Sequence, residues 1–309
     1  MTQPETWPRV AVIGAGAVGG YYGGIMARSG ASVVMIGRPA FVEAVQAQGL
    51  FLETTQFQEF IRVEAATELS AVRGADIVLF CVKTTDTADV ACQLAPLLTP
   101  SSEVVSLQNG VDNAEQIRAA SNIDAVGSVV YVAAAAKAPG HIQHFGRGDL
   151  VIGPVSERLQ QLAAQFERCG IPCRVSANIE GELWTKFVIN CALNAVSALG
   201  QAKYGRIAAS ADARKMLAAI VDEMLAVAHA SRLVLPGMED SVAAQAVVMK
   251  IATQMTEQFS STGQDLNRGK LTEIDSLNGY VARRGAELGV PTPVNHALYT
   301  LVKLAEGQR

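Results

Sequence analysis

A lysine and two asparagines, each four residues apart, are the side chains in this sequence with the clearest chemical potential. Lys186, Asn190 and Asn194 fall in a segment with the pattern of a helix, where residues four apart lie on one face. The neighbouring residues are largely apolar, so the three form one polar stripe. Burying an ammonium and two amides costs free energy unless they are hydrogen-bonded, and a bound polar ligand would supply those bonds.

The stripe also has an interpretation without a ligand. Lys186 can extend along the edge of the helix to reach water, and the two asparagines can bond to neighbouring backbone groups. The stripe alone does not distinguish these interpretations. Polar residues elsewhere in the chain have to decide between them.

A glycine-rich turn close to the N-terminus predicts a site for a dinucleotide. Residues 8–13 have the composition of a strand, residues 21–29 are compatible with a helix, and GxGxxG stands between them. Gly14 permits the tight turn, Gly16 the approach of a pyrophosphate, and Gly19 the close packing of helix on strand. The alternative is a glycine-rich turn that binds nothing.

The end of the second predicted strand, residues 32–36, indicates which dinucleotide to expect. Enzymes that prefer NAD usually carry an acidic residue here for the ribose 2′-hydroxyl, whereas this chain has Gly37-Arg38. A guanidinium suits a 2′-phosphate, so Arg38 favours NADP. The alternative is an ordinary loop arginine, because Pro39 is expected to mark a loop.

Two further predicted strands end in polar residues. The apolar run 76–82 is typical of a parallel strand buried on both faces, and Lys83 follows it. Residues 103–107 predict another strand, which Asn109 follows. Ligands of doubly wound sheets bind beside the carboxyl ends of strands, so both side chains are candidates for contacting a cofactor or substrate. A surface lysine and an Asn-Gly turn are the alternatives.

The remaining predicted elements alternate up to about residue 180 and are helical afterwards. In the first part we expect a helix at 114–120, a strand at 125–132, a hairpin of 141–145 with 150–152, a helix at 157–169 and a link at 175–179. In the second part we expect helices at 180–198, 212–232, 238–259, 270–288 and 294–305. His141 and His144 are expected to be solvated or hydrogen-bonded strand residues.

A polar block interrupts the predicted helices of the second part. Residues 260–266 are small and polar, and Glu273 and Asp275 lie close to the start of the next predicted helix. Helix capping and interaction with the helix dipole explain most of this block without a ligand. Its presence in the same chain as the stripe at Lys186 is what makes it a candidate for binding.

Length and composition narrow the class of protein. At 309 residues the chain exceeds the usual size of one hydrophobic core, so we expect a dinucleotide-binding domain, 1–177, and an all-helical domain, 178–309. The net charge of -4 and the lack of a basic block argue against a nucleic-acid partner. With no signal-peptide pattern and no run apolar enough to span a bilayer, we expect a cytoplasmic protein.

The cysteines and histidines do not predict a metal site. The chain has five cysteines and four histidines, and none has the spacing typical of zinc ligands. We therefore expect no metal and interpret all five cysteines as small buried apolar residues.

Together, these motifs resemble the ketopantoate reductase family, the NADP-dependent 2-dehydropantoate 2-reductases of pantothenate and coenzyme A synthesis. The resemblance covers nearly the whole chain. It rests on the glycine turn, Cys81-Val82-Lys83, Gln108-Asn109-Gly110, the helix with Lys186, Asn190 and Asn194, and Ser260-Ser261 with Thr272-Glu273-Ile274-Asp275. It implies an α/β Rossmann-type N-terminal domain and an all-α C-terminal domain like that of 6-phosphogluconate dehydrogenase.

The resemblance implies roles for five residues of the helical domain. Lys186 would be the general acid, and Glu273 would bond to the substrate hydroxyl and to the lysine. Asn190 and Asn194 would hold the substrate. Ser261 would contact the substrate carboxylate.

It also implies roles in the first domain and shows one departure. Lys83 and Asn109 would lie by the cofactor and the reacting centre, and Arg38 takes the place of the residue that reads the 2′-phosphate. Three residues before the matched serine the family can offer an asparagine to the substrate, and this chain has Gln258 there.

The activity implied is the reduction of ketopantoate by NADPH, with hydride transfer to the ketone carbon and a positioned ammonium protonating the alkoxide. The rival interpretations are a reductase of another 2-oxo acid, an opine- or hydroxyacid-type dehydrogenase, and a non-catalytic NADP-binding sensor. A sensor would leave the polar stripe without a chemical task. The Ala-, Val- and Leu-rich helical domain is compatible with a homodimer.

Overall fold

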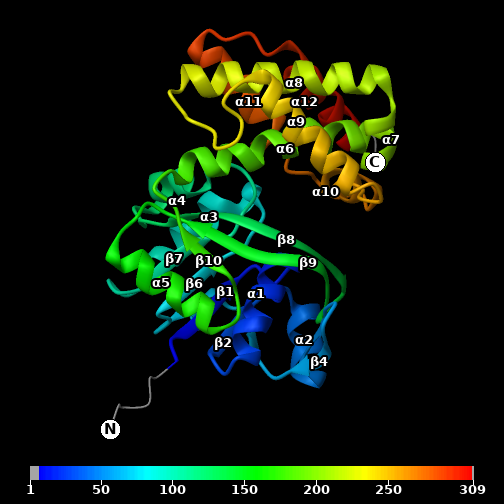
Figure 1. The fold of residues 1–309 in the computed structure, drawn as a ribbon. Helices are drawn as coiled ribbons and strands as arrows, with labels where there is room; N and C mark the ends of the chain where they lie inside the picture. The colour runs from blue at the N-terminus through cyan, green and yellow to red at the C-terminus, as the bar shows by residue number, and fades with distance from the viewer. Residues whose placement is uncertain (1–6, 308–309) are drawn as a thin grey trace. The chain divides into compact units, whose positions relative to one another are not determined.

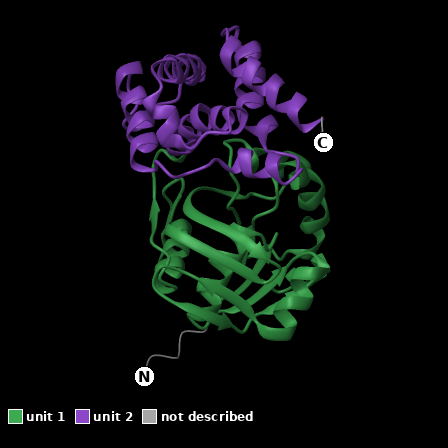
Figure 2. Cartoon of the chain, turned by 90° about the vertical axis from the view of Figure 1, so that its right-hand side faces the viewer, with its two compact units in different colours: residues 1–179 green, residues 180–309 purple. Residues whose placement is uncertain are grey.

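The computed structural model describes residues 7–307, which divide into two compact units. Figure 2 distinguishes unit 1, residues 1–179, from unit 2, residues 180–309. The described part of unit 1 is a sheet covered by helices, and that of unit 2 is helical (Figure 1), which confirms the predicted fold class. Within residues 7–307, no helix combines the length and the apolar character that crossing a membrane requires.

The sheet of unit 1 contains ten strands in the described residues. Its order is β4-β3-β9-β8-β7-β6-β1-β2-β5, and β10 pairs with β9. The strands are β1 Arg9–Ile13, β2 Ser32–Ile36, β3 Leu50–Glu53, β4 Gln58–Ile61, β5 Glu64–Ala66, β6 Ile77–Phe80, β7 Glu103–Ser106, β8 Val126–Ala138, β9 His141–Ile152 and β10 Cys173–Val175. The pairs from β5 through β2, β1, β6 and β7 to β8 are parallel, whereas β8–β9 and β3–β4 are antiparallel.

Helices cover both faces of the parallel part of this sheet. They are α1 Ala17–Arg28, α2 Pro39–Gln48, α3 Thr87–Leu94, α4 Asn113–Ser121 and α5 Glu157–Arg168, with short 3-10 helices η1 Leu69–Val72, η2 Thr84–Asp86 and η3 Ala95–Leu97. Val10 and Val12 of β1 pack in one core with residues of α1, α2 and α5, whereas Ala11 and Ile13 pack in a second core with residues of α3 and α4. Since β1 is buried on both faces, its sequence is apolar without alternation.

Helix α1 lies close to the sheet because glycines occupy its buried face. A Cβ atom at Gly23 would lie 2.7 Å from Val12 Cγ2, and one at Gly20 would lie 2.6 Å from Ile142 Cγ1. Both distances are shorter than atoms tolerate, so these positions permit the contact only as glycine.

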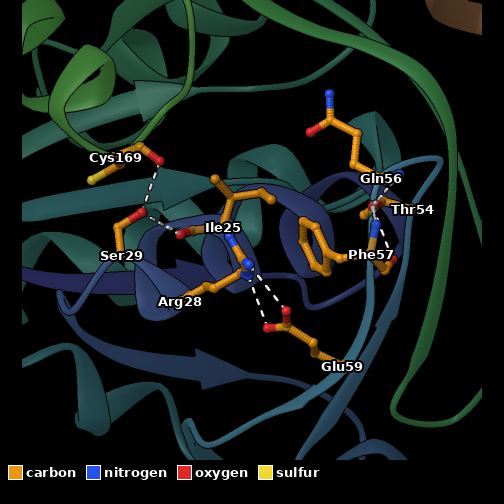
Figure 3. A network of polar contacts seen from close by, with 8 residues as sticks. All are labelled: Ile25, Arg28, Ser29, Thr54, Gln56, Phe57, Glu59 and Cys169. Carbon is orange, nitrogen blue, oxygen red and sulfur yellow. Dashed lines mark hydrogen bonds and ion pairs between the residues drawn. The ribbon is translucent and has the colours of Figure 1, made fainter.

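The C-terminal end of α1 is fastened to its surroundings by polar contacts (Figure 3). Ser29 Oγ bonds to the carbonyl of Ile25, at 3.0 Å, and to that of Cys169, at 2.8 Å. Arg28 donates two hydrogen bonds to the carboxylate of Glu59 on β4, at 2.9 and 3.0 Å, and its guanidinium lies 4.0 Å from the ring centroid of Phe57. These contacts hold the C-terminal end of α1, whereas the glycine turn lies at its N-terminal end.

Unit 2 consists, in its described part, of helices joined by short connections. They are α6 Ile179–Gly200, α7 Tyr204–Ala209, α8 Ala211–Ala230, α9 Ser241–Gln254, α10 Ser261–Asn267, η4 Ile274–Ser276, α11 Asn278–Leu288 and α12 Pro293–Glu306. A buried chain of amides ties four of them together. Asn278 Nδ2 donates to Cys191 O on α6, at 3.2 Å, and to Asn295 Oδ1 on α12, at 2.9 Å. Asn295 Nδ2 in turn donates to Glu223 Oε2 on α8, at 2.8 Å.

Two specific predictions for unit 1 differ from the structure. Pro39 does not mark a loop but is the first residue of α2, where its missing N–H and restricted φ suit the start of a helix. Residues 141–145 and 150–152 do not pair as a hairpin but both belong to β9, which pairs along its length with β8. The glycines that predicted a turn instead form an irregularity within the strand, where Gly146, Arg147 and Gly148 all have positive φ.

The polar block of unit 2 is also organised differently. Residues 260–266 do not form a break without helix but make up the cap and nearly all of the short helix α10, because Ser260 Oγ accepts from the N–H of Gly263 and caps it. The helix predicted at 270–288 begins only at Asn278, after η4. The helix predicted at 238–259 is shorter and runs over α9.

Cys92 is exposed, so the prediction of five buried cysteines was wrong for that residue.

Candidate active site

Four strand ends of unit 1 meet at one edge of the parallel sheet. The register places Ile13 opposite both Ile36 and Phe80, and Phe80 opposite Ser106. The glycine turn, Arg38, Lys83 and Asn109 each follow one of these strand ends closely. Since neighbouring strands are about 5 Å apart, the residues predicted to bind a cofactor follow one another along this edge, with the glycine turn between Arg38 and Lys83.

The three glycines of the turn have different surroundings. Gly14 has a φ of +90°, and a Cβ there would lie 2.7 Å from the carbonyl of Cys81. A Cβ at Gly19 would lie 2.5 Å from the carbonyl oxygen of Gly14 and 2.8 Å from Val12 Cγ1. These two positions therefore require glycine for the turn and for the packing of α1.

Gly16 is different because a Cβ there would meet nothing within 4 Å. It is the N-cap of α1, and no side chain caps that helix end. The N–H groups at a helix N-terminus attract anions, and the lack of neighbours around a Cβ at Gly16 lets a ligand approach the backbone there. The turn therefore fits the pyrophosphate of a dinucleotide.

Arg38 is held by its backbone while its side chain is exposed. The N–H of Gly37 donates to Ala66 O, at 3.0 Å, and Arg38 O accepts from the N–H of Phe41, at 2.9 Å, as α2 begins. The exposed guanidinium extends from a fixed point at the end of β2. A positive group in this position can pair with a phosphate, whereas it offers no acceptor to a ribose hydroxyl.

A buried glutamine joins the loops that carry Lys83 and Asn109. Gln108 Nε2 donates to Val82 O, at 3.1 Å, and to Thr87 Oγ1, at 2.7 Å. The bonds connect the loop after β7 with the loop after β6. Gln108 thereby bonds to the backbone just before Lys83 and to a side chain at the start of α3, and its own backbone continues directly into Asn109.

The stripe of unit 2 lies on α6, as predicted, and aromatic residues near its lysine in the sequence pack against α11. Successive members of the stripe are about 6 Å apart along the helix axis. The rings of Trp184 and Phe187 pack edge to face, with centroids 5.3 Å apart, and both contact Tyr280 of α11 in the same manner. Lys186 stands between these two aromatic residues in the sequence, so its helix segment is anchored by α11.

The last member of the stripe is held at both its side chain and its backbone. Tyr204 Oη donates to Asn194 Oδ1, at 2.9 Å, and Ser260 Oγ donates to Asn194 O, at 2.9 Å. Ser260 is the cap of α10 and Ser261 is its first residue. The structure therefore brings Ser261 close to the Asn194 end of α6. At the departure from the family pattern, the Gln258 amide donates to Phe259 O, at 3.0 Å.

Glu273 lies between two residues that are anchored to α12. Before it, the N–H and hydroxyl of Thr272 donate to Glu306 Oε1, at 2.8 and 2.7 Å. After it, Asp275 Oδ2 accepts from Lys303 Nζ, at 2.9 Å. Asp275 lies in the first turn of η4, as the dipole interpretation expects, and its carboxylate also bonds to α12.

The charges of Asp275, Lys303 and Glu306, which bind this segment to α12, stabilise one another. Partial burial raises the pKa of Asp275, but hydrogen bonds from Lys303 and Tyr299 outweigh it and hold the pKa below its ordinary value. Burial likewise raises the pKa of Glu306, and bonds from Thr272 and Lys303 reverse the effect. The two carboxylates in turn raise the pKa of Lys303. The segment around Glu273 is thus bound to α12 by groups that remain charged at neutral pH.

The two histidines of β9 are hydrogen-bonded strand residues, as predicted, although Nδ1 of His144 is buried without a partner among the described residues. His141 Nε2 lies 2.9 Å from Glu53 Oε2, and His144 Nε2 lies 2.6 Å from Arg147 O. No sequence signal singles out Gln108 or Tyr204, because their partners are known only once the chain is folded. The QNG motif contains Gln108, but its loop-joining role depends on β6 and β7 lying side by side.

Comparison with known proteins places this geometry in one family. A family model described as "Ketopantoate reductase PanE/ApbA" matches residues 10–157, and one described as "Ketopantoate reductase PanE/ApbA C terminal" matches residues 178–306. A relative from Archaeoglobus fulgidus named 2-dehydropantoate 2-reductase is 31% identical over 302 residues, covering 96% of this chain and 98% of its own length.

Solved structures agree on the fold. The crystal structure of a PanE/ApbA family ketopantoate reductase from Ralstonia eutropha JMP134 is 47% identical and has a TM-score of 0.92, with 97% of this chain and 99% of that chain covered. The ternary structure of D-mandelate dehydrogenase with NADH and anilino(oxo)acetate is 24% identical, with a TM-score of 0.90 and coverage of 97% and 99%. At that identity it shows a shared fold. With family models matching both units and full-length relatives at this identity, the chain belongs to the ketopantoate reductase family of nicotinamide-dependent oxidoreductases.

Proposed function

We propose that this protein reduces ketopantoate to pantoate with NADPH, a step in the synthesis of pantothenate and coenzyme A. The observation that carries the proposal is the polar stripe on α6, which ends where Asn194 meets the start of α10. Relatives named 2-dehydropantoate 2-reductase, which match 96% of the chain, support the same substrate.

Residues 1–177 are proposed to bind the cofactor. Gly14, Gly16 and Gly19 leave the N-terminus of α1 open to the pyrophosphate, and Arg38 pairs with the 2′-phosphate that distinguishes NADP from NAD. Lys83 and Asn109 follow the next two strand ends and contact the cofactor beside the reacting centre. When bound, the reduced nicotinamide supplies the hydride.

Residues 178–309 are proposed to bind the 2-oxo acid and to supply the proton that its reduction requires. Asn190 and Asn194 donate hydrogen bonds to substrate oxygens, and Ser261 at the start of α10 contacts the carboxylate. Reduction converts the ketone carbon to an alkoxide, so one proton has to reach that oxygen. Lys186 stabilises the alkoxide with its ammonium and then donates this proton, and Glu273 orients Lys186 and bonds to the product hydroxyl.

A second candidate is a reductase of another 2-oxo acid on the same fold. The structural relative D-mandelate dehydrogenase was solved with NADH and anilino(oxo)acetate, so this fold accommodates other oxo acids. A non-catalytic NADP-binding sensor is a third candidate. It gives no task to Lys186 or Glu273, and it predicts cofactor binding without turnover.

The deciding experiment follows NADPH absorbance after the purified protein is mixed with ketopantoate. Pyruvate, 2-oxoisovalerate and oxaloacetate are tested beside it, each with NADPH and with NADH. Fast oxidation of NADPH by ketopantoate alone supports the proposal. Faster oxidation of NADPH by another acid would make that acid, and not ketopantoate, the substrate. Tight binding of NADPH without oxidation by any acid favours the sensor.

A further inference from the structure

Tyr204 contributes the one side-chain hydrogen bond in the described residues that reaches the carboxamide of Asn194. The phenol oxygen lies 2.9 Å from Asn194 Oδ1, and both side chains are buried. A buried O–H has to find an acceptor, and of the two ends of a carboxamide only the oxygen accepts. Burial also raises the pKa of Tyr204, so the phenol keeps its proton at neutral pH.

The backbone around Tyr204 keeps its ring in place. The N–H of Tyr204 donates to Gln258 O, at 2.9 Å, and that of Gly205 donates to Thr256 O, at 3.0 Å. A Cβ atom at Gly205 would lie 2.9 Å from Thr256 Cβ, so the start of α7 packs tightly on the segment after α9. Tyr204 therefore reaches Asn194 from a support that does not depend on α6 itself.

Asn194 is also fixed at its backbone, where Ser260 Oγ donates to its carbonyl oxygen at 2.9 Å. Ser260 is completely buried, and its own N–H donates to Ser197 Oγ one turn further along α6, at 3.2 Å. With the backbone held by Ser260 and the amide oxygen held by Tyr204, the carboxamide has one orientation. Since its oxygen faces Tyr204, the carboxamide turns the two N–H donors of Nδ2 away from that residue.

We infer that Tyr204 is a positioning residue that turns Asn194 into an obligate hydrogen-bond donor, so that this end of the stripe selects substrates with an oxygen acceptor. This inference rests on the proposed function and refines its substrate class. Carboxylate, ketone and hydroxyl oxygens satisfy such a donor. A substrate that presents an ammonium there, as an amino acid does, would place its N–H donors against those of Asn194, and neither group would find an acceptor.

The test compares Tyr204→Phe with the wild type in the full-length protein. The variant keeps the ring but removes the O–H, so Asn194 can turn its oxygen toward the substrate. We expect the KM for the 2-oxo acid to rise about tenfold, the size of one hydrogen bond, with the KM for NADPH unchanged. Tyr22→Phe is the matched control, since Tyr22 is a fully buried tyrosine whose hydroxyl has no hydrogen-bond partner among the described residues.

A double-mutant cycle separates positioning from a general structural effect. If Tyr204 acts through Asn194, adding Tyr204→Phe to Asn194→Ala changes the KM of the 2-oxo acid no further. Full additivity of the two changes would overturn the inference, and so would an unchanged KM in the single variant. Thermal unfolding of each variant verifies that it is folded.

A binding measurement distinguishes failure of this inference from failure of the proposed function. Calorimetry measures the affinity of pantoate for the NADP-loaded wild type and Tyr204→Phe proteins, and about a tenfold loss is expected for the variant. If the wild type is active and pantoate binds to the wild type and to Tyr204→Phe with equal affinity, the inference is wrong and the proposed function stands. A wild type that neither reduces nor binds these acids overturns the inference together with the proposed function.

Discussion

At the scale of single residues, Lys186 is the side chain on which the proposed reaction depends most directly. Replacing it by alanine removes the ammonium that protonates the alkoxide, so we expect turnover to fall by about 100-fold or more. Steady-state rates with saturating NADPH and 2-oxo acid measure this effect. Lys250→Ala, an exposed lysine on α9, is the matched control. An unchanged turnover number for Lys186→Ala would remove the residue from the mechanism.

Arg38 is the residue on which, in the proposed function, the choice of cofactor depends. Without its guanidinium the 2′-phosphate loses its partner, so Arg38→Ala should raise the KM for NADPH by at least about tenfold and leave that for NADH nearly unchanged. The exposed Arg62 provides a control substitution in the same unit. Equal effects on the two cofactors would contradict a role in binding the 2′-phosphate.

The cysteines differ in reactivity because they differ in burial. Cys92 is exposed, whereas Cys191 is buried and burial raises the pKa of its thiol well above the ordinary value. Burial also raises the pKa of Cys173 to about 12. We expect Cys92 to react first with a thiol reagent at pH 8 because nucleophilic attack requires the thiolate. Rapid labelling that persists in Cys92→Ser would contradict this.

Which site residues the sequence could predict depends on how local their geometry is. Lys186, Asn190 and Asn194 share a face of α6 through helix periodicity alone, so a pattern in the sequence was sufficient to propose them as a group. Tyr204 acts on Asn194 across the turn between α6 and α7, and no periodicity relates the two. Cys92 looked like the other cysteines because composition carries no information on which face of α3 is solvated.

At the scale of elements, the loops after β6 and β7 act together because Gln108 joins them. Gln108→Leu leaves the carbonyl of Val82 and the hydroxyl of Thr87 without this donor, which costs about 1–3 kcal/mol in a buried site. We expect a lower denaturation midpoint together with a higher KM for NADPH, since the loops of Lys83 and Asn109 loosen. Gln93→Leu on the exposed face of α3 is the control. Full stability and unchanged KM in Gln108→Leu would disprove the link.

The elements that the sequence predicted well are those with a strong and local pattern. Strand β2 was predicted at its observed bounds, and β1 within one residue, because buried parallel strands are uniformly apolar. Strands β3, β4 and β5 were missed, since they are short and partly exposed. The bounds of α9 were wrong although its cap, Asp240, is a local signal, whereas those of α11 were wrong because the anchoring of Thr272 to Glu306 depends on a tertiary contact.

At the scale of the whole molecule, pH acts on stability through the charges that hold the segment of Glu273. The pKa values of Asp275 and Glu306 are lowered in the folded state, so their contribution is present above the ordinary carboxyl pKa and is lost as pH falls through the lowered values. The pKa of Lys303 is raised, so its contribution is present at neutral pH and is lost only in strong alkali.

Lys303→Met should therefore destabilise the protein at pH 7 and have progressively less effect below about pH 4. We expect a loss of about 1 kcal/mol, because the side chain of Lys303 is 40% exposed and solvent screens its ion pairs. Denaturant unfolding at several pH values measures the difference. Lys250→Met controls for the loss of a charge. A difference between Lys303→Met and wild type that is the same at pH 7 and pH 3 would contradict the assignment.

Helix α1 has a further consequence for how the chain acquires its structure. Gly19, Gly20, Gly23 and Gly24 lie within its 12 residues, and each glycine disfavours an isolated helix by about 1 kcal/mol. A free peptide of this sequence should therefore be a random coil in water, which circular dichroism would reveal. Packing against the rest of the chain offsets this cost, and part of that packing is the contact of Gly20 with Ile142 on β9. The ribosome adds Ile142 long after residue 20. We expect the helix behind the glycine turn to form late in synthesis, only after the strands that cover it have emerged.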